Sequence, residues 1–133
     1  MQKSNIKDVL PDNSMLKYFE GKVEVRKVIN DSITKDLETF LVTFENGART
    51  KLHYHEVDQV LMATEGKGII ALETKIEMTN DNSAKIRMDE VQDLSPGDFV
   101  CVPAFKWHWH GARKGENFAH YQIKKSGKTV WVE

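Results

Sequence analysis

The sequence has little of several features that would indicate particular classes of protein. It contains one cysteine, Cys101, so an internal disulfide is excluded. Its longest apolar run, residues 99–105, is far shorter than the roughly 20 residues that a membrane-spanning helix needs. The 19 basic and 20 acidic residues leave a net charge of −1, without the basic surface that nucleic acid or an anionic membrane attracts. We therefore expect neither of these as a partner.

Targeting signals and helices are also scarce. The first residues, MQKSNIKDVLPDNS, lack the apolar stretch of a signal peptide, which together with the single cysteine favours a cytoplasmic location. The best helical candidate, residues 6–16, is interrupted by Pro11. With 133 residues, of which 40% are hydrophobic, the chain is expected to form one domain, 1–133, with its own core.

The sequence does contain many short runs rich in β-branched and aromatic residues, separated by turn residues such as Asn46-Gly47 and Ser126-Gly127. The runs are residues 22–29, 38–44, 58–66, 68–78, 84–91, 97–103, 118–125 and 128–133. Short strands at this spacing predict an all-β fold, an antiparallel sandwich or β-barrel. The hairpin over 69–91 is long and charged on one side, so we expect it to project from the body.

The five histidines form the main functional signal. They are His53, His55, His108, His110 and His120. Side chains alternate between the faces of a strand, so each His-x-His pair points to one side, and Gln59 shares the parity of the first pair. Two such pairs on neighbouring strands would bring four imidazoles into one cavity, where they suit zinc, copper, iron or nickel, and manganese with added oxygen ligands. A lone His-x-His is more often part of a surface strand.

The wider spacing resembles the two sequence motifs of the cupin superfamily over residues 40–123. The residues that match the motifs are Gly47, His53, His55, Gln59, Gly66, Gly97, Pro103 and His108. The resemblance implies a double-stranded β-helix, the jelly-roll barrel of cupins. Phe105 stands where the motif commonly has glycine and Ala112 where it often has asparagine. Gln59 replaces the usual glutamate, so every protein ligand would be neutral and the ion would be a stronger Lewis acid. Alternatively, the fourth ligand is lost.

The segment His108-Trp109-His110-Gly111, followed by His120, resembles the small single-domain cupins that include manganese-dependent hydroxynitrile lyases. This resemblance implies a divalent metal, with manganese favoured and iron, zinc, nickel or copper as alternatives. Its implied ligands are His53, His55, Gln59 and His108. His110 is then the expected acid/base, and His120 orients the substrate or shares the proton. The alternatives are that His110 supports His108 and that His120 is a core histidine bonded to a backbone carbonyl.

The expected function is that of a metal-dependent enzyme acting on a small organic molecule, by lyase-type, non-redox chemistry at a carbonyl or hydroxyl carbon. A metal-dependent dioxygenase and a non-catalytic binding module are the alternatives, and the fold does not choose among them. Phe40, Val42 and Phe44 share one strand face and are expected to form an apolar pocket wall. Alternatively, the residues on the opposite face of this strand, beginning at Leu41, line the pocket.

Other residues receive simpler interpretations. Trp107 and Trp109 alternate with histidines, so they are expected to face away from the cavity. Cys101 is interpreted as a small core residue. Residues 124–128 are predicted to form a solvated turn, and residues 129–133 an edge strand. The resemblance to small cupins implies a homodimer or a higher homo-oligomer, and the terminal strands are a candidate contact because exposed edges aggregate unless they are paired.

Overall fold

The computed structural model describes residues 1–132 and is built almost entirely of antiparallel strands. The first sheet contains β1 (Phe19–Glu20), β4 (Arg49–Thr50), β5 (His53–His55), β7 (Gly68–Leu72), β10 (Glu90–Leu94), β12 (His108–Ala112) and β14 (Thr129–Trp131). The second sheet contains β2 (Val23–Ile29), β3 (Leu37–Phe44), β6 (Gln59–Gly66), β11 (Phe99–Val102) and β13 (Phe118–Lys125).

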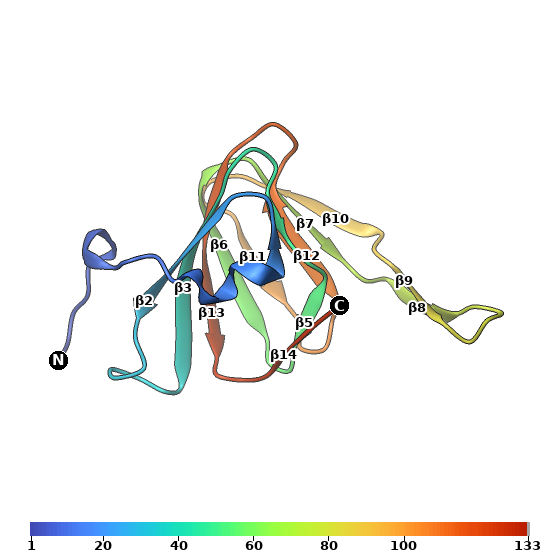
Figure 1. The fold of residues 1–133 in the computed structure, drawn as a ribbon, viewed down its shortest axis with the longest axis horizontal. Helices are drawn as coiled ribbons and strands as arrows, with labels where there is room; N and C mark the ends of the chain where they lie inside the picture. The colour runs from blue at the N-terminus through green and yellow to red at the C-terminus, as the bar shows by residue number, and fades with distance from the viewer. Residues whose placement is uncertain (133) are drawn as a thin grey trace.

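The two sheets face one another and form the body of the molecule (Figure 1). The first sheet has the order β1-β4-β12-β5-β14, and β7 joins it through β12 and carries β10. The second has the order β11-β6-β13-β3-β2. Neighbouring strands come from distant parts of the chain, as in the double-stranded β-helix, and the predicted antiparallel jelly-roll barrel is confirmed.

The core lies between the sheets because each strand turns alternate side chains inward. Along β3, Phe40, Val42 and Phe44 are buried, whereas Leu41 and Thr43 are only partly buried. The fully buried apolar side chains of the core, with less than 2% exposure, include Val25, Phe44, Leu61, Ile70, Val102 and Phe118. Their removal from water is the main favourable contribution to folding of this body.

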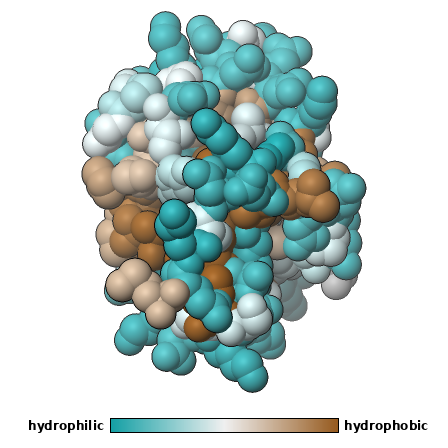
Figure 2. Space-filling model, turned by 90° about the vertical axis from the view of Figure 1, so that its left-hand side faces the viewer, coloured by the Kyte–Doolittle hydropathy of each residue, from teal (hydrophilic) through white to brown (hydrophobic). Residues whose placement is uncertain are grey.

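The segment before β1 forms two 3-10 helices, η1 (Ile6–Asp8) and η2 (Asn13–Tyr18), on either side of Pro11. The side chain of Asp12 caps η2 by accepting a hydrogen bond from the backbone N–H of Ser14 at 2.9 Å. In residues 1–132 no helix has the length and apolar character of a membrane span. Figure 2 shows the face on this side of the molecule, where hydrophobic patches lie among a mostly hydrophilic surface.

The long hairpin is divided between the body and a projecting arm. β7 and β10 belong to the first sheet, whereas β8 (Lys75–Met78) and β9 (Ala84–Arg87) pair only with each other and extend away from the body (Figure 1). Ile76 and Met78 of this arm are exposed. The expectation that the hairpin projects is therefore confirmed for its outer half.

Two expectations about strands have different outcomes. The interpretation of Cys101 as a core residue is wrong, because its side chain is exposed. It lies on β11, at an edge of its sheet, and shares the solvent face with Phe99, while Val102 points into the core. β14 pairs only with β5 and is an edge strand as expected, although Glu133 lies outside the described residues. Pairing of this edge with a second copy stays a prediction.

Candidate metal centre

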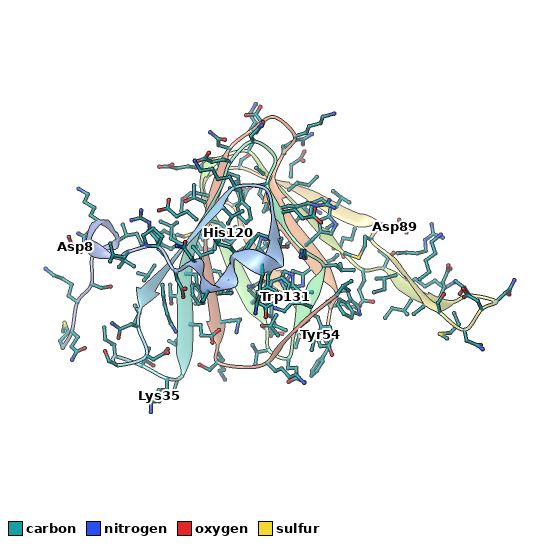
Figure 3. All side chains as sticks on the ribbon, in the orientation of Figure 1. Asp8, Lys35, Tyr54, Asp89, His120 and Trp131 are labelled. Atoms are coloured by element: carbon teal, nitrogen blue, oxygen red, sulfur yellow. The ribbon has the colours of Figure 1, made fainter. Side chains whose placement is uncertain are left out.

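Both sheets contribute to the histidine cluster, and all five imidazoles are buried. β5 supplies His53 and His55, and β12 supplies His108 and His110 from the same sheet. His108 lies directly opposite His53 in the antiparallel register. His120 comes from β13 of the facing sheet and lies inside the body (Figure 3). The two facing sheets thus bring together side chains from three strands.

Backbone carbonyls orient two of these rings. The Nδ1 atoms of His53 and His108 each lie 2.8 Å from the carbonyl oxygen two residues earlier, those of Lys51 and Lys106. A carbonyl oxygen only accepts hydrogen bonds, so Nδ1 carries the proton in both rings. The lone pair of each ring is therefore on Nε2, the atom that turns toward the cluster. This arrangement is typical of metal-ligating histidines.

A third ring, His55, has its Nδ1 atom 2.8 Å from the hydroxyl oxygen of Thr129 in β14. Several buried polar atoms of the cluster then have no hydrogen-bond partner in the described structure. They are Nε2 of His55, His108 and His110, Nδ1 of His120, and both amide atoms of Gln59. Buried polar groups are nearly always satisfied, so such a concentration of unpaired polar atoms, most of them able to accept, indicates a ligand between them. The donor set, three or more imidazoles with an amide oxygen, fits a divalent metal ion.

The geometry adds His110 to the candidate ligands. The ligand atoms of His53, His108 and His110 lie within 4.8 Å of one another. His55 is also close, with its ring centroid 5.0 Å from that of His53 and 5.3 Å from that of His108. Gln59 is fully buried at the start of β6. The described structure thus gathers the histidines of the expected ligand set and buries Gln59, and which four residues bind stays a prediction.

Burial keeps these histidines neutral. It lowers the pKa of His55 to about 3 and that of His108 to about 4. It also holds the pKa values of His53 and His110 well below 6.5, and the neighbouring histidines add to this effect. Since a metal binds the neutral imidazole, the site is prepared for a cation near pH 7 without first losing protons.

His110 and His120 form a buried pair. His120 Nε2 lies 3.0 Å from His110 Nδ1, so one ring donates a hydrogen bond to the other. Burial lowers the pKa of His120 to about 4. Phe44 packs against both rings, with centroid distances of 6.0 Å to His110 and 5.4 Å to His120. In the described structure the hydrogen bond of His120 thus runs to His110.

A cavity of about 170 Å³ opens beside the histidines. It is lined by Met15, Phe19, Glu38, Phe40, Val42, Thr50, His53, His55, His110, Gln122, Lys124, Gly127, Thr129 and Trp131. Phe44, expected in the pocket wall, instead lies deeper, behind His110 and His120. At the other side of Trp131 the ring of Tyr18 stacks on it at 4.3 Å, which joins η2 to β14. The cavity therefore has an apolar wall from β3 and a rim made by segments far apart in the sequence.

Sequence reasoning missed Lys124 and Glu38. Residues 124–128 were expected to form a solvated turn, and this is wrong for Lys124, which belongs to β13 and is buried. The alternation along β13 contained the signal, because Gln122 and Lys124 share the parity of His120 and so face the cavity. The strand continues for one residue beyond Lys124 before the chain turns.

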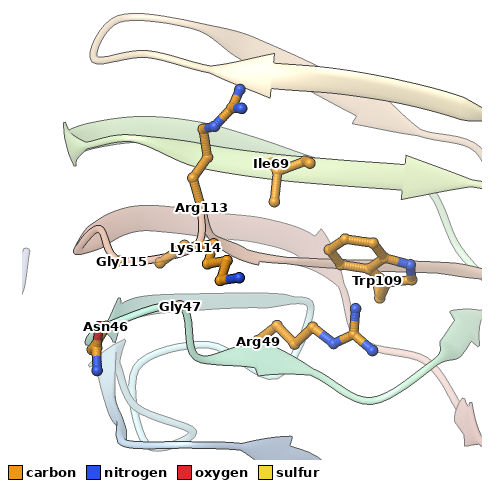
Figure 4. Close-up of a pocket in the computed structure, with 9 residues that line it drawn as sticks. Asn46, Gly47, Arg49, Ile69, Trp109, Arg113, Lys114 and Gly115 are labelled. Carbon is orange, nitrogen blue, oxygen red and sulfur yellow. The ribbon is translucent and has the colours of Figure 1, made fainter.

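A wider groove of about 650 Å³ lies on the outer side of the first sheet, where Trp109 faces away from the histidines as expected (Figure 4). The Arg49 guanidinium lies 4.5 Å from the centroid of the Trp109 ring and 3.3 Å from Glu20. Another groove residue, Arg113, pairs with Asp93. Both arginines here have partners, and the described groove residues include none of the buried unsatisfied polar atoms found in the histidine cluster.

The fold and the buried histidine cluster define a cupin with a site suited to a divalent metal. The cupin domain family matches residues 40–121, and the chain belongs to this family. A particular relative, (R)-mandelonitrile lyase from Granulicella tundricola, is 35% identical over 119 residues, which cover 87% of this chain and 80% of that protein.

Solved structures agree with this fold. A cupin-like protein from Thermotoga maritima has a TM-score of 0.73 and 27% identity, over 99% of this chain and 86% of that one. The polyketide cyclase RemF from Streptomyces resistomycificus has a TM-score of 0.76 at 14% identity, over 100% and 86% of the two chains. The second similarity concerns the fold alone.

Proposed function

We propose that this protein is a metal-dependent enzyme that cleaves or forms a carbon–carbon bond next to a hydroxyl or carbonyl group, as a hydroxynitrile lyase does with a cyanohydrin. The observation that supports this proposal is the buried histidine cluster, in which several Nε2 atoms, like the buried amide of Gln59, have no hydrogen-bond partner in the described structure. The resemblance to (R)-mandelonitrile lyase gives the reaction type. A cavity of about 170 Å³ suits a small substrate, since about 150 Å³ accommodates benzene.

In this proposal a divalent ion, with manganese favoured, is held by His53, His55, Gln59 and His108. When bound, such an ion supplies a Lewis acid that polarises a hydroxyl or carbonyl oxygen. The protein contributes the orientation of the rings through Lys51, Lys106 and Thr129. It also contributes a neutral ligand set, which leaves the charge of the ion undiminished for the substrate.

His110 takes the role of acid and base. When its Nδ1 donates to Nε2 of His120, its own Nε2 has a free lone pair for the hydroxyl proton of a cyanohydrin. As that proton moves to His110, the carbonyl forms, the bond to the nitrile carbon breaks, and its electron pair leaves with cyanide. The proton then passes from His110 to cyanide, so that an aldehyde and hydrogen cyanide are the products. His120 fixes the tautomer and orientation of His110 throughout.

The test combines metal analysis with mandelonitrile cleavage for protein purified without a histidine tag. We expect near-stoichiometric metal in the wild type, loss of metal and cleavage in His55→Ala, and loss of cleavage with metal retained in His110→Ala. Metal lost in His110→Ala but kept in His55→Ala would instead assign His53, His108 and His110 as the ligands.

The same experiment separates the other candidate functions. Cleavage that is absent with every metal, together with metal-dependent oxygen consumption in the presence of iron, copper or nickel, would favour a dioxygenase. Absence of metal from both the wild type and His55→Ala, even after incubation with each ion, would contradict the metal site and favour a binding module.

A further inference from the structure

Lys124 is a cation inside the cavity to which the proposed reaction assigns no role. Its side chain is only 3% exposed, and it lies on β13 between Glu38 of β3 and Gln59 of β6, its two cross-strand neighbours. Lysine is almost never buried to this extent unless it is paired, because the desolvation of an ammonium group is costly. The position therefore calls for partners within the cavity.

The partners that the structure shows do not use all the donors of this ammonium group. Lys124 Nζ forms an ion pair with Glu38 and otherwise lies 3.5 Å from the carbonyl oxygen of Lys125, the limit of a hydrogen bond. An ammonium group has three N–H donors, so at least one is available to a ligand. Glu38 is 27% exposed, and thus the negative charge lies nearer to solvent than the positive one.

The surroundings of Lys124 strengthen its electrostatic interaction with a ligand in the cavity. Among the lining residues, Lys124 is the one cation and Glu38 the one anion, since the histidines are held neutral by burial. Phe40, Val42 and Trp131 form apolar walls, which reduce screening by water. A ligand that enters past these walls thus meets the Lys124–Glu38 pair, with its ammonium donors, on one side and the histidine cluster on the other.

We propose that Lys124 binds a carboxylate group of the substrate, so that the site takes a small organic monoacid whose hydroxyl or carbonyl group faces the histidines. The proposal rests on the proposed function and narrows its substrate class. The Lys124–Glu38 pair has no net charge, so one added negative charge costs less here than the two of a phosphate group. The cavity volume limits the acid to about the size of benzoate.

The test measures binding of benzoate and its neutral analogue benzamide to the manganese-loaded protein by calorimetry, with tryptophan fluorescence as a second signal because Trp131 lines the cavity. We expect benzoate to bind the wild type about tenfold more tightly than benzamide. Lys124→Met removes the charge and should weaken benzoate about tenfold, with benzamide unaffected. Glu38→Gln removes the competing carboxylate and should strengthen benzoate binding several-fold.

The two variants shift benzoate affinity in opposite directions only if the lysine binds the ligand. Unchanged benzoate affinity in Lys124→Met, equal affinities of benzoate and benzamide, or no binding of benzoate at millimolar concentration would overturn the proposal. The double variant E38Q/K124M leaves no unpaired charge, and its benzoate affinity should equal that of Lys124→Met. It therefore replaces Lys124→Met if that single variant does not fold. Metal analysis of the same samples shows whether the metal site itself has failed. If it has, benzoate binding of the wild type and the variants is compared in the metal-free proteins, which still tests the role of Lys124.

Discussion

The two faces of β12 differ in the polar groups that they leave unsatisfied. On the inner face, His108 and His110 are buried, and their Nε2 atoms have no partner. On the outer face, Trp109 is half-buried beside a groove in which the arginines are already paired. The outer hollow is much the larger, with about 650 Å³ against about 170 Å³. The size of a hollow is thus a poorer guide to function than the polar atoms that line it.

The largest expected effect is on metal affinity, which substitutions on the inner face of β12 should lower and substitutions on the outer face should not. His108→Ala removes a ligand and should lower metal affinity at least about 100-fold, with a parallel loss of cleavage. Trp109→Leu on the opposite face should leave both unchanged. Equilibrium dialysis against manganese measures the affinity, and circular dichroism shows whether each variant is folded. Equal metal affinity of His108→Ala and the wild type would remove the distinction between the faces.

A second prediction concerns Gly111, where the outer side of β12 is tightly covered. A Cβ atom there would lie 2.4 Å from the carbonyl oxygen of Ala48 and 2.5 Å from Arg49 Cα. Gly111→Ala should therefore lower the free energy of unfolding by about 3 kcal/mol, as severe overpacking does. Gly115→Ala is the control, because nothing lies within 4 Å and only its φ of +75° opposes a side chain, at about 1 kcal/mol. Urea unfolding measures both, and similar losses would contradict the assigned contact.

Acid should destabilise the inner face selectively. Burial lowers the pKa values of His55 and His120 to about 3 and about 4, whereas an unfolded histidine titrates near 6.5. Below pH 6.5 the unfolded chain binds protons that the folded chain excludes, so stability is complete above this pH and falls toward pH 4. Each such histidine contributes up to about 1.4 kcal/mol per pH unit.

Urea midpoints of the metal-free protein between pH 8 and pH 4.5 test this prediction. The slope should become smaller in His120→Phe, which removes one of the titrating groups. A slope that is the same in the wild type and in His120→Phe would show that His120 is not kept neutral by the fold.

The smallest effect is expected at Phe105, in the loop that leads to β12. This phenylalanine is 61% exposed and has a φ of +65°, in the left-handed region that disfavours most side chains. Phe105→Asn should raise the free energy of unfolding by up to about 1 kcal/mol, since asparagine tolerates this conformation. A loss of stability would instead show that contact with Tyr54, 6.1 Å away between ring centroids, outweighs the strain.

The sequence predicted the fold and the gathering of the histidines because both depend on regular alternation. The inference from the His-x-His pairs and from the spacing of the cupin motifs does not change when the strand boundaries are shifted by a residue or two. Even the departure at Phe105 had a physical meaning, since the glycine usual at that position matches the positive φ found here.

Two misses arose where the surroundings of a strand decide the outcome. Cys101 was placed in the core from its apolar neighbours, but β11 is an edge strand whose outer face has no covering layer. Lys124 was assigned to solvent from the charged residues after it, although its cross-strand neighbours Glu38 and Gln59 place it in the cavity. His110 stays ambiguous between base and ligand because sequence spacing does not give the distances between Nε2 atoms.

The contacts of β14 connect the histidine cluster to the rim of the cavity. Thr129 orients His55, and Trp131 meets Tyr18 at the rim, so both depend on a strand that is made after every other part of the cluster. His108 takes its orientation from the carbonyl group of Lys106, whereas the ring of His53, although hydrogen-bonded to Lys51, also stacks on Trp131 at 4.2 Å. One short edge strand therefore supports two rings of the histidine cluster and part of the cavity rim at the same time.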